Sequence, residues 1–311
     1  MSMMPNSSLP PVGIVILSWN RARDTLACLA SLERVDYPAR QVIVVDNGST
    51  DGSPALIRQQ YPSVVLLASG RNLGFAGGCN LGMAAALRIG VRYVLLLNND
   101  TEVAPDFLGR LVAAAERSPD VGMVGPTIYY HEHPDVIWSA GGMVDRYGTP
   151  RHDRVDTPDD GTLPPVREVD YVTGCAILVK RSVIERIGFL DDRFFAYFEE
   201  TEWCARARRV GFRVLHVPEA RVWHKIRRDE RGGSPLYLYL MARNRLLYLS
   251  CTGASPWILL TAAVDLLRTA ASWTIRPRYR HLRPLAPAVL RGVTDFFRGR
   301  FGAPSARSLH G

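Results

Sequence analysis

Cysteine is scarce in this sequence of 311 residues, and its distribution excludes two common uses of the residue. The number is odd and no Cys-x-x-Cys pair occurs, so neither a structural zinc site nor a disulfide framework is indicated. The five are Cys28, Cys79, Cys175, Cys204 and Cys251. A reducing cytosol fits this pattern best. A secretory signal is also not expected, because residues 1–11 contain neither a charged segment nor an apolar run.

Two nucleotide-binding motifs are absent as well. No Gly-Lys-Ser or Gly-Lys-Thr occurs, which excludes a Walker A motif, and the glycine-rich segment 71–80 lacks the dinucleotide fingerprint. Glycines before a helix still let backbone N–H groups approach a phosphate. Close packing of a helix on a strand at Gly77 and Gly78 explains them equally well, so both interpretations stay open at this point.

Acidic residues are few in the last third of the chain. Residues 205–311 contain 20 Lys and Arg against 5 Asp and Glu, a charge of +15. Residues 1–204 contain 18 against 25, a charge of −7. An acidic body with a basic tail predicts an anionic partner for the tail, such as lipid, nucleic acid or a phosphorylated substrate. A solvated basic surface is the alternative.

Apolar runs of strand length alternate with segments of helical spacing. The length, the apolar fraction of 47% and the charged fraction of 22% fit one large α/β domain with appendages, or two domains. Buried strands are predicted at 12–17, 42–45, 64–67, 94–97 and 121–128, and the first four are each followed by a helix, the last of these helices over 103–117. This alternation predicts a parallel sheet with right-handed crossovers.

The middle of the sequence is less regular. Residues 144–166 are polar and rich in Pro and Gly, which predicts a long surface loop near a substrate. Residues 171–179 predict a strand with Gly174 inside it, and such a glycine often marks the close approach of a ligand. Residues 213–218 predict an edge strand that ends at its proline.

Polar residues follow the predicted strand 94–97 directly. They are Asn98, Asn99 and Asp100. Ligands of open α/β sheets bind at the carboxyl ends of strands, where Asp100 would offer a hard oxygen ligand. A turn or a helix cap is the simpler explanation of such residues.

Three glutamates open a predicted helix at Glu199. Glu202 and Arg206 are four residues apart, which predicts a structural ion pair. Glu200 lies about 160° away around the helix and faces something else. Carboxylates are stabilised in a first helical turn by the helix dipole. The functional alternative is a carboxylate aimed into a cleft by four aromatic residues, Phe194, Phe195, Tyr197 and Phe198.

The C-terminal segment predicts an amphipathic helix over 257–275. Its polar residues, which include Asp265 and Arg268, fall on one helical stripe and argue against a transmembrane span. Four arginines follow, at Arg276, Arg278, Arg280 and Arg283. An apolar face beside a cationic cluster suits a membrane interface, and packing against the main domain is the rival.

Six motifs in one order resemble the family 2 inverting glycosyltransferases with a GT-A fold, in particular the rhamnosyltransferase-type enzymes of bacterial polysaccharide assembly. The motifs lie at 15–21, 44–53, 71–78, 97–101, 173–175 and 195–202, and are extended by His224 and by 243–245. The similarity spans residues 12 to 249. It implies an α/β fold with a Rossmann-like, mostly parallel central sheet flanked by helices, and a C-terminal helical extension.

The resemblance also implies a domain organisation. Residues 1–11 would be a disordered N-terminus and residues 12–250 the glycosyltransferase domain. Residues 251–311 would form a basic amphipathic tail that is able to associate with a membrane. The protein would then be cytoplasmic and peripheral at the inner face of the cell membrane.

Site residues follow from the same resemblance. The nucleotide-sugar would be held by Ser18, Asn20, Arg21, Asp46, Arg71, Asn72, Asn98 and Asn99, with Asp46 reading the N3–H of uracil or thymine. Asp100, the one carboxylate left of an Asp-x-Asp motif, would bind Mg²⁺ or Mn²⁺ together with His224. Glu200 would be the general base, with Glu199 as second choice because Glu replaces the usual Asp. Gly174 and Cys175 would border the acceptor.

The implied reaction moves a sugar, for example rhamnose, from a dTDP or UDP donor to a hydroxyl of a glycan or lipid-linked acceptor in cell-surface polysaccharide synthesis. A direct displacement would invert the anomeric carbon. A catalytically idle nucleotide-sugar-binding scaffold is the alternative. No nucleic-acid motif supports binding of DNA or RNA by the tail. A processive synthase is not expected, because the Gln-x-x-Arg-Trp motif is absent.

Overall fold

The computed structural model describes residues 9–227 and 233–304. Most of the segment that the sequence predicts to be disordered, residues 1–11, lies outside the described residues. Where the description begins, the chain is already tied to the sheet. The Pro10 carbonyl accepts a hydrogen bond from the Tyr37 hydroxyl, and the Pro11 carbonyl accepts one from the Arg92 amide.

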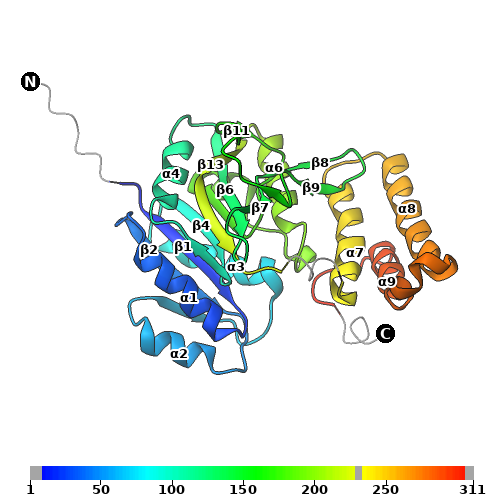
Figure 1. Cartoon of the computed structure of the whole chain (residues 1–311), viewed down its shortest axis with the longest axis horizontal. Helices are drawn as coiled ribbons and strands as arrows, with labels where there is room; N and C mark the ends of the chain where they lie inside the picture. The colour runs from blue at the N-terminus through cyan, green and yellow to red at the C-terminus, as the bar shows by residue number, and fades with distance from the viewer. Residues whose placement is uncertain (1–8, 228–232, 305–311) are drawn as a thin grey trace, which may run out of the picture.

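A mixed sheet forms the centre of the molecule, in the order β10-β7-β6-β12-β4-β1-β2-β3 (Figure 1). Four strands run parallel: β1 (Val12–Ser18), β2 (Arg40–Asp46), β3 (Val65–Ala68) and β4 (Tyr93–Asn98). Next to them β12 (Ala176–Lys180) runs antiparallel between β4 and β6 (Val121–Tyr130). In this register Ser18 pairs with Asp46 and Leu17 with Asn98, so the carboxyl ends of three strands meet at one edge.

Helices cover both faces because strand residues alternate between two cores. Ile14 and Ile16 pack on one side, under α1 (Ala22–Glu33), α2 (Ser53–Gln60) and α4 (Phe107–Ala115). Val15 packs on the other side, under α3 (Gly74–Arg88), α5 (Arg181–Ile187) and α6 (Glu199–Arg209). The predicted α/β architecture with helices on both faces is confirmed.

Glycines in α3 bring that helix close to β1. A Cβ at Gly78 would lie 2.2 Å from Leu17 Cδ1, and one at Gly82 would lie 2.3 Å from Val15 Cγ1. Close packing therefore accounts for Gly78, whereas Gly77 meets only Leu73 of its own turn.

Three sequence predictions about irregular segments were wrong. The strand after Tyr171 begins only at Ala176, so Gly174 lies in the turn before it. Pro218 does not end its strand, because β13 (Arg213–His224) passes it through an irregularity between Val217 and Arg221. That strand is not at an edge either: it pairs with β6, with β5 (Thr101–Val103) and with β11 (Arg167–Glu168).

The predicted helix over 103–117 is also shorter than expected, because β5 occupies its start. The predicted loop 144–166 contains strands as well. A hairpin pairs β8 (Gly142–Val144) with β9 (Pro150–His152), and β10 (Thr157–Pro158) extends the sheet beside β7 (Val136–Ser139).

The C-terminal part is a layer of helices beside the sheet domain (Figure 1). It consists of α7 (Pro235–Cys251), α8 (Pro256–Ile275), η3 (Pro277–Leu285) and α9 (Ala286–Phe297). Ser234 and Ser255 cap α7 and α8 by accepting backbone N–H bonds, and a proline occupies the first helical position after each. Close contact of α7 with α9 depends on Gly292, where a Cβ would lie 2.5 Å from the Tyr239 carbonyl oxygen.

Helix α8 divides its apolar residues between two faces. Ala262, Ala263 and Ala270 are buried against the other helices. The opposite, outward face carries an apolar stripe at Trp257, Leu260, Val264, Leu267 and Ile275. By length and composition α8 could cross a membrane, and only 17% of its most apolar window is buried inside the protein. The amphipathic character predicted from the sequence thus coexists with packing on the helical layer.

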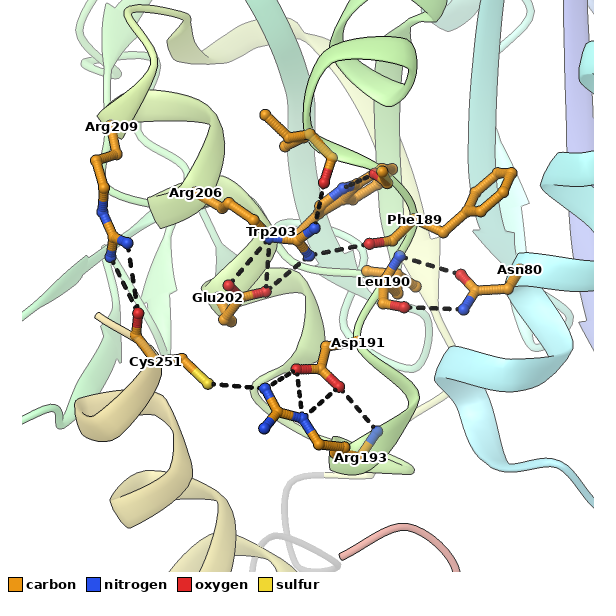
Figure 2. A network of polar contacts seen from close by, with 12 residues as sticks. Asn80, Phe189, Leu190, Asp191, Arg193, Glu202, Trp203, Arg206, Arg209 and Cys251 are labelled. Atoms are coloured by element: carbon orange, nitrogen blue, oxygen red, sulfur yellow. Dashed lines mark hydrogen bonds and ion pairs between the residues drawn. The ribbon is translucent and has the colours of Figure 1, made fainter. Parts of the chain in front are cut away.

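A polar network connects α6 to its surroundings (Figure 2). The predicted pair forms: Arg206 binds Glu202 at 2.8 Å and also donates to the carbonyls of Ile187 and Phe189. Arg209, one turn later on α6, donates to the Cys251 carbonyl at the end of α7. These bonds hold α6 in place relative to both the sheet and the helical layer.

Replacement of Arg206 by Met is expected to destabilise the protein by about 2–4 kcal/mol, because Glu202 and two carbonyls lose their partner. Chemical denaturation measures this. Arg110→Met is the matched control, since Arg110 pairs with Asp106 at the same spacing but on the surface, and it should cost less than about 1 kcal/mol. Equal losses in the two variants would contradict the structural role of Arg206.

Candidate active site

A cavity of 570 Å³ lies where the carboxyl ends of the central strands meet the helical layer. Eight of the site residues that the family resemblance implies line it: Arg21, Asn98, Asp100, Gly174, Cys175, Glu199, Glu200 and His224. Asp100 and Glu200 therefore line the same cavity, although a hundred positions separate them in the chain.

One end of the cavity is built around Asp100. Pairing of β5 with β13 places His224 opposite Thr101, so His224 Nε2 lies 3.1 Å from Asp100 Oδ1. Arg21 Nη1 lies 3.5 Å from Asp100 Oδ2. Burial would raise the pKa of Asp100, but His224 and Arg21 lower it below its ordinary value. The carboxylate is therefore ionised at neutral pH.

The same contact also shifts the pKa of His224. Burial would lower the pKa of His224, but Cys175 and the Asp100 carboxylate raise it above its ordinary value. The imidazole is accordingly protonated beside Asp100. A cation that bound both side chains would displace this proton, because only neutral imidazole is a metal ligand.

The donor set at this end fits a divalent cation. His224 Nε2 and Asp100 Oδ1 form an ion-pair contact at 3.1 Å, and Asp100 Oδ1 and His224 Nδ1 are both buried atoms that no hydrogen bond among the described residues satisfies. A separation of that size suits two adjacent ligands of an octahedral ion with bonds of about 2.1 Å. Within residues 9–227 and 233–304 no group of three or more His, Cys, Asp or Glu side chains is placed to hold a metal. Two protein ligands would thus leave several positions to water or phosphate.

The other end is built around the start of α6. Three of the four residues directly before α6 have positive φ: Phe195 (67°), Tyr197 (67°) and Phe198 (73°). Non-glycine residues adopt this conformation at a cost, and it persists only where the surroundings hold it. The result is a sharp bend that directs Glu199 and Glu200 into the cavity.

The two carboxyls differ in their surroundings. Burial raises the pKa of Glu199 well above its ordinary value, and the charge of Glu200 raises it further. Burial also raises the pKa of Glu200, but backbone N–H groups, including those of Thr201 and Gly174, oppose this. Each keeps one buried Oε2 atom without a hydrogen-bond partner. The pKa of Glu199 is therefore raised more than that of Glu200, and Glu200 is the better candidate for a base.

A short turn joins the two ends. The Cys175 carbonyl accepts the Asn98 amide at 2.9 Å, and Cys175 contacts His224. One residue earlier, a Cβ at Gly174 would lie 3.7 Å from Glu200 Cβ and 3.1 Å from the ring of Phe75. An added Cβ would press on the Phe75 ring and would be in ordinary contact with Glu200, so this turn lies directly between the Asp100 end and the Glu200 end of the cavity.

Residues of α7 support the bend before α6. Asn244 is fully buried, and its Nδ2 donates to the carbonyls of Phe194, Ala196 and Tyr197 at 2.8–2.9 Å. Arg243, also buried, donates to the Phe194 carbonyl at 2.9 Å. These two side chains satisfy the carbonyls that the strained backbone turns inward.

The remaining predicted residues lie beside the cavity and do not line it. Ser18 is buried and bonds Thr25, and Asn99 also donates to Thr25, at 2.9 Å. Asp46 accepts from the Ser49 amide, and Asn20 accepts from Thr50. Asn72 accepts from Asn47 and Gly74, whereas the Arg71 side chain is exposed. These groups make a polar rim at the ends of β1, β2 and β4.

The aromatic cluster was predicted only in part. Tyr197 and Phe198 line the cavity, but Phe194 is buried in the core of the helical layer and Phe195 packs against Gly74. Four further aromatic residues that line the cavity were not predicted from the sequence: Trp138, His152, Tyr171 and Tyr237. They come from the hairpin region and from α7, whose positions depend on tertiary packing.

Comparison with known proteins finds a matching family and several relatives. The family described as "Glycosyl transferase family 2" matches residues 13–188. An N-acetylglucosaminyl-diphospho-decaprenol L-rhamnosyltransferase of Mycobacterium tuberculosis is 28% identical over 268 residues, covering 80% of this chain and 83% of its own. A low-salt glycan biosynthesis hexosyltransferase of Haloferax volcanii is 28% identical over 258 residues, covering 77% and 75%.

Solved structures share the fold. A mannosyltransferase from Pyrobaculum calidifontis, in complex with GDP-Man and Mn²⁺, matches with a TM-score of 0.58 and 18% identity, covering 94% of this chain and 89% of its own. GalNAc-T7 with UDP, GalNAc and Mn²⁺ matches with a TM-score of 0.63 and 16% identity, covering 94% and 57%.

Replacement of Glu199 by Gln is expected to change how stability depends on pH. An acid whose pKa is raised in the folded state loses stability as pH rises above its unfolded value, here 4.5, because the unfolded chain releases the proton first. The wild-type Tm should therefore exceed or equal that of Glu199→Gln near pH 4.5 and fall relative to it toward pH 8. The exposed Glu219→Gln is the control and should track the wild type. Parallel Tm curves for all three proteins would show that Glu199 is ionised in the fold.

Proposed function

The chain belongs to glycosyl transferase family 2, and from that premise we propose an inverting enzyme that transfers a sugar from a dTDP or UDP donor to a lipid-linked glycan. One observation carries the proposal. Asp100 and Glu200 line a single cavity, with an ionised carboxylate and a histidine at one end and a buried carboxyl pair at the other. Displacement at an anomeric carbon needs these two functions on opposite sides of the sugar.

The donor is assigned to the end that holds Asp100. The polar rim around Asp46 and Asn20 would take the nucleoside, and Arg21 would approach the diphosphate. A divalent cation, held by Asp100 and His224, would supply positive charge that stabilises the nucleoside diphosphate as it leaves. The Mn²⁺ and nucleotide ligands named for the two solved structures support this class of donor complex.

The acceptor is assigned to the end that holds Glu200. An acceptor hydroxyl beside the Glu200 carboxylate would transfer its proton to that carboxylate as the oxygen attacks the sugar. Burial in the cavity raises the pKa of Glu200 and so its basicity, while hydrogen bonds from backbone N–H groups favour its ionised form. A single displacement of this kind inverts the anomeric configuration.

The acceptor class rests on similarity. The name of the Mycobacterium relative specifies a sugar on diphospho-decaprenol as acceptor and a rhamnosyl group as the sugar transferred. At 28% identity we take from it the lipid-linked class of acceptor, with rhamnose as the first donor sugar to try.

The decisive experiment separates an enzyme from an idle scaffold. We expect Glu200→Gln to lower sugar transfer by about 10²–10⁴-fold, because the proton acceptor is lost. The same variant should keep the rise in Tm that UDP- or dTDP-sugars produce with Mn²⁺. Asp100→Asn should lose that Tm rise.

Glu132→Gln, an exposed glutamate outside the cavity, is the matched control and should behave as the wild type. Transfer and donor hydrolysis that are equally low in the wild type and in Glu200→Gln would support the scaffold instead. A Tm rise that Asp100→Asn retains would contradict the assignment of the donor end.

We further infer that the outward stripe of α8 binds the surface of an anionic membrane. Trp257, Leu260, Val264 and Leu267 present apolar groups next to the exposed arginines of η3, which begin at Arg278. Apolar area beside cationic groups is the combination that binds acidic lipid headgroups. The inner face of α8 packs on the helical layer and Asp265 pairs with Arg245, so the helix would lie in the interface without crossing it.

Binding to vesicles tests this surface. Wild-type protein should sediment with phosphatidylglycerol vesicles. It should be released by 1 M salt, where the Debye length is only about 3 Å, because the attraction is largely electrostatic. Leu260→Glu should lower binding strongly, whereas Thr261→Glu, the same charge on the polar half of the helix, should lower it much less. Equal effects of the two substitutions would contradict an apolar contact at this stripe, and retention in 1 M salt would point to insertion.

A further inference from the structure

Two tyrosines from distant parts of the chain form one wall of the cavity. Tyr197 lies in the bend before α6, and Tyr237 lies in the first turn of α7. Their rings meet edge to face with centroids 5.0 Å apart. Tyr197 is nevertheless 44% exposed, so the pair presents aromatic surface to the cavity and is not buried in a core.

The backbone holds this exposed ring in a strained conformation. Tyr197 has a φ of 67°, and its carbonyl accepts from the buried Asn244 at 2.8 Å. Tyr237 is fixed by the Ser234 cap, since its own amide donates to Ser234 Oγ. Because Asn244 and Tyr237 both belong to α7, one helix holds both tyrosines in place. Strained, exposed aromatic residues with such support are typical of binding sites.

The pair lies on the side of the base. Tyr197 precedes Glu200 by three residues, and the charge of Glu199 contributes to the raised pKa of Tyr197. Tyr171 is also in the cavity wall. Its pKa is raised by burial and, in smaller part, by Glu200 and Tyr237. The contacts that define the other end join Asp100 to Arg21 and His224 and involve neither tyrosine.

Both phenols remain protonated and available. Burial raises the pKa of Tyr197 and of Tyr237, so each keeps its O–H at neutral pH. None of the hydrogen bonds found among the described residues uses either hydroxyl. Each tyrosine thus offers an apolar ring and a free polar group at the same place.

We propose that Tyr197 and Tyr237 form the subsite for the acceptor sugar, and this rests on the proposed function. A pyranose ring has an apolar C–H face that packs on an aromatic ring and a rim of hydroxyls that bond to phenols. The subsite would hold the acceptor ring so that one hydroxyl reaches Glu200. It therefore selects a carbohydrate acceptor, whereas a bare prenyl phosphate would not need it.

Binding is measured without turnover, so that the subsite is tested separately from catalysis. The protein is the full-length Glu200→Gln variant loaded with UDP and Mn²⁺. The probes are N-acetylglucosaminyl-diphospho-farnesol, which carries a sugar, and farnesyl phosphate, which does not. Affinities are read by calorimetry for proteins that carry Tyr237→Ala, Tyr237→Phe or Tyr197→Leu in addition.

Tyr237→Ala and Tyr197→Leu should each weaken binding of the sugar-bearing probe by about tenfold, the loss that corresponds to one aromatic contact with its buried area. Tyr237→Phe keeps the ring and should stay within about threefold. Farnesyl phosphate should bind all variants alike. Tyr279→Ala, in η3 and outside the cavity, is the control for loss of a tyrosine elsewhere.

Three results would overturn the proposal: unchanged affinity for the sugar-bearing probe in both variants, an equal loss for farnesyl phosphate, or a loss in Tyr237→Phe as large as in Tyr237→Ala. Tm values and UDP affinity report whether a variant is folded. The tyrosine variants could show the predicted binding differences while the wild-type protein transfers no sugar. That outcome would refute the enzyme and leave the subsite standing.

Discussion

The hydrogen bonds from Arg243 and Asn244 to the bend before α6 are the interaction on which the active site depends. The bend contains three non-glycine residues with positive φ, and such a backbone is not stable by itself. Asn244 alone donates to three of its carbonyls, from a position with no exposure to solvent. The strain is therefore balanced from α7, a helix that begins almost forty residues after the bend. Since Glu199 and Glu200 follow the bend directly, their direction is decided by the same bonds.

The helical layer is for this reason part of the catalytic unit and not an accessory. Helix α7 holds the bend before Glu199 and Glu200, the proposed base, through Asn244, and it lines the cavity through Tyr237 and Met241. Helix α8 in turn packs on the layer with one face and turns an apolar stripe outward with the other. A lipid-linked acceptor would reach the cavity from a membrane on that side of the molecule. One helical layer would then contact the membrane, bind the acceptor and hold the proposed base in position.

Much of the fold and part of the site could be predicted from local sequence. The short apolar runs that became β1, β2 and β4 have the length of buried strands, and their polar ends marked Asp100 and the rim around Asp46. The spacing of Glu202 and Arg206 predicted their ion pair correctly. By contrast, Pro218 suggested the end of a strand because a proline cannot donate to the ladder. The chain bypasses that loss with an irregular pairing to β6, which only the neighbouring strand reveals.

The sequence by itself thus determined the main buried strands, most of the helices and the positions of the polar residues at the strand ends, because periodicity, caps and charge are local properties of the chain. Tertiary structure decided how those residues are used. It set Asp100 Oδ1 at 3.1 Å from His224 Nε2, buried Glu199 more deeply than Glu200, and brought Tyr237 to Tyr197. Burial, electrostatic coupling and ring contacts depend on which distant segments pack together, and no local pattern encodes that choice for a hairpin and a helix that fold onto the sheet from outside it.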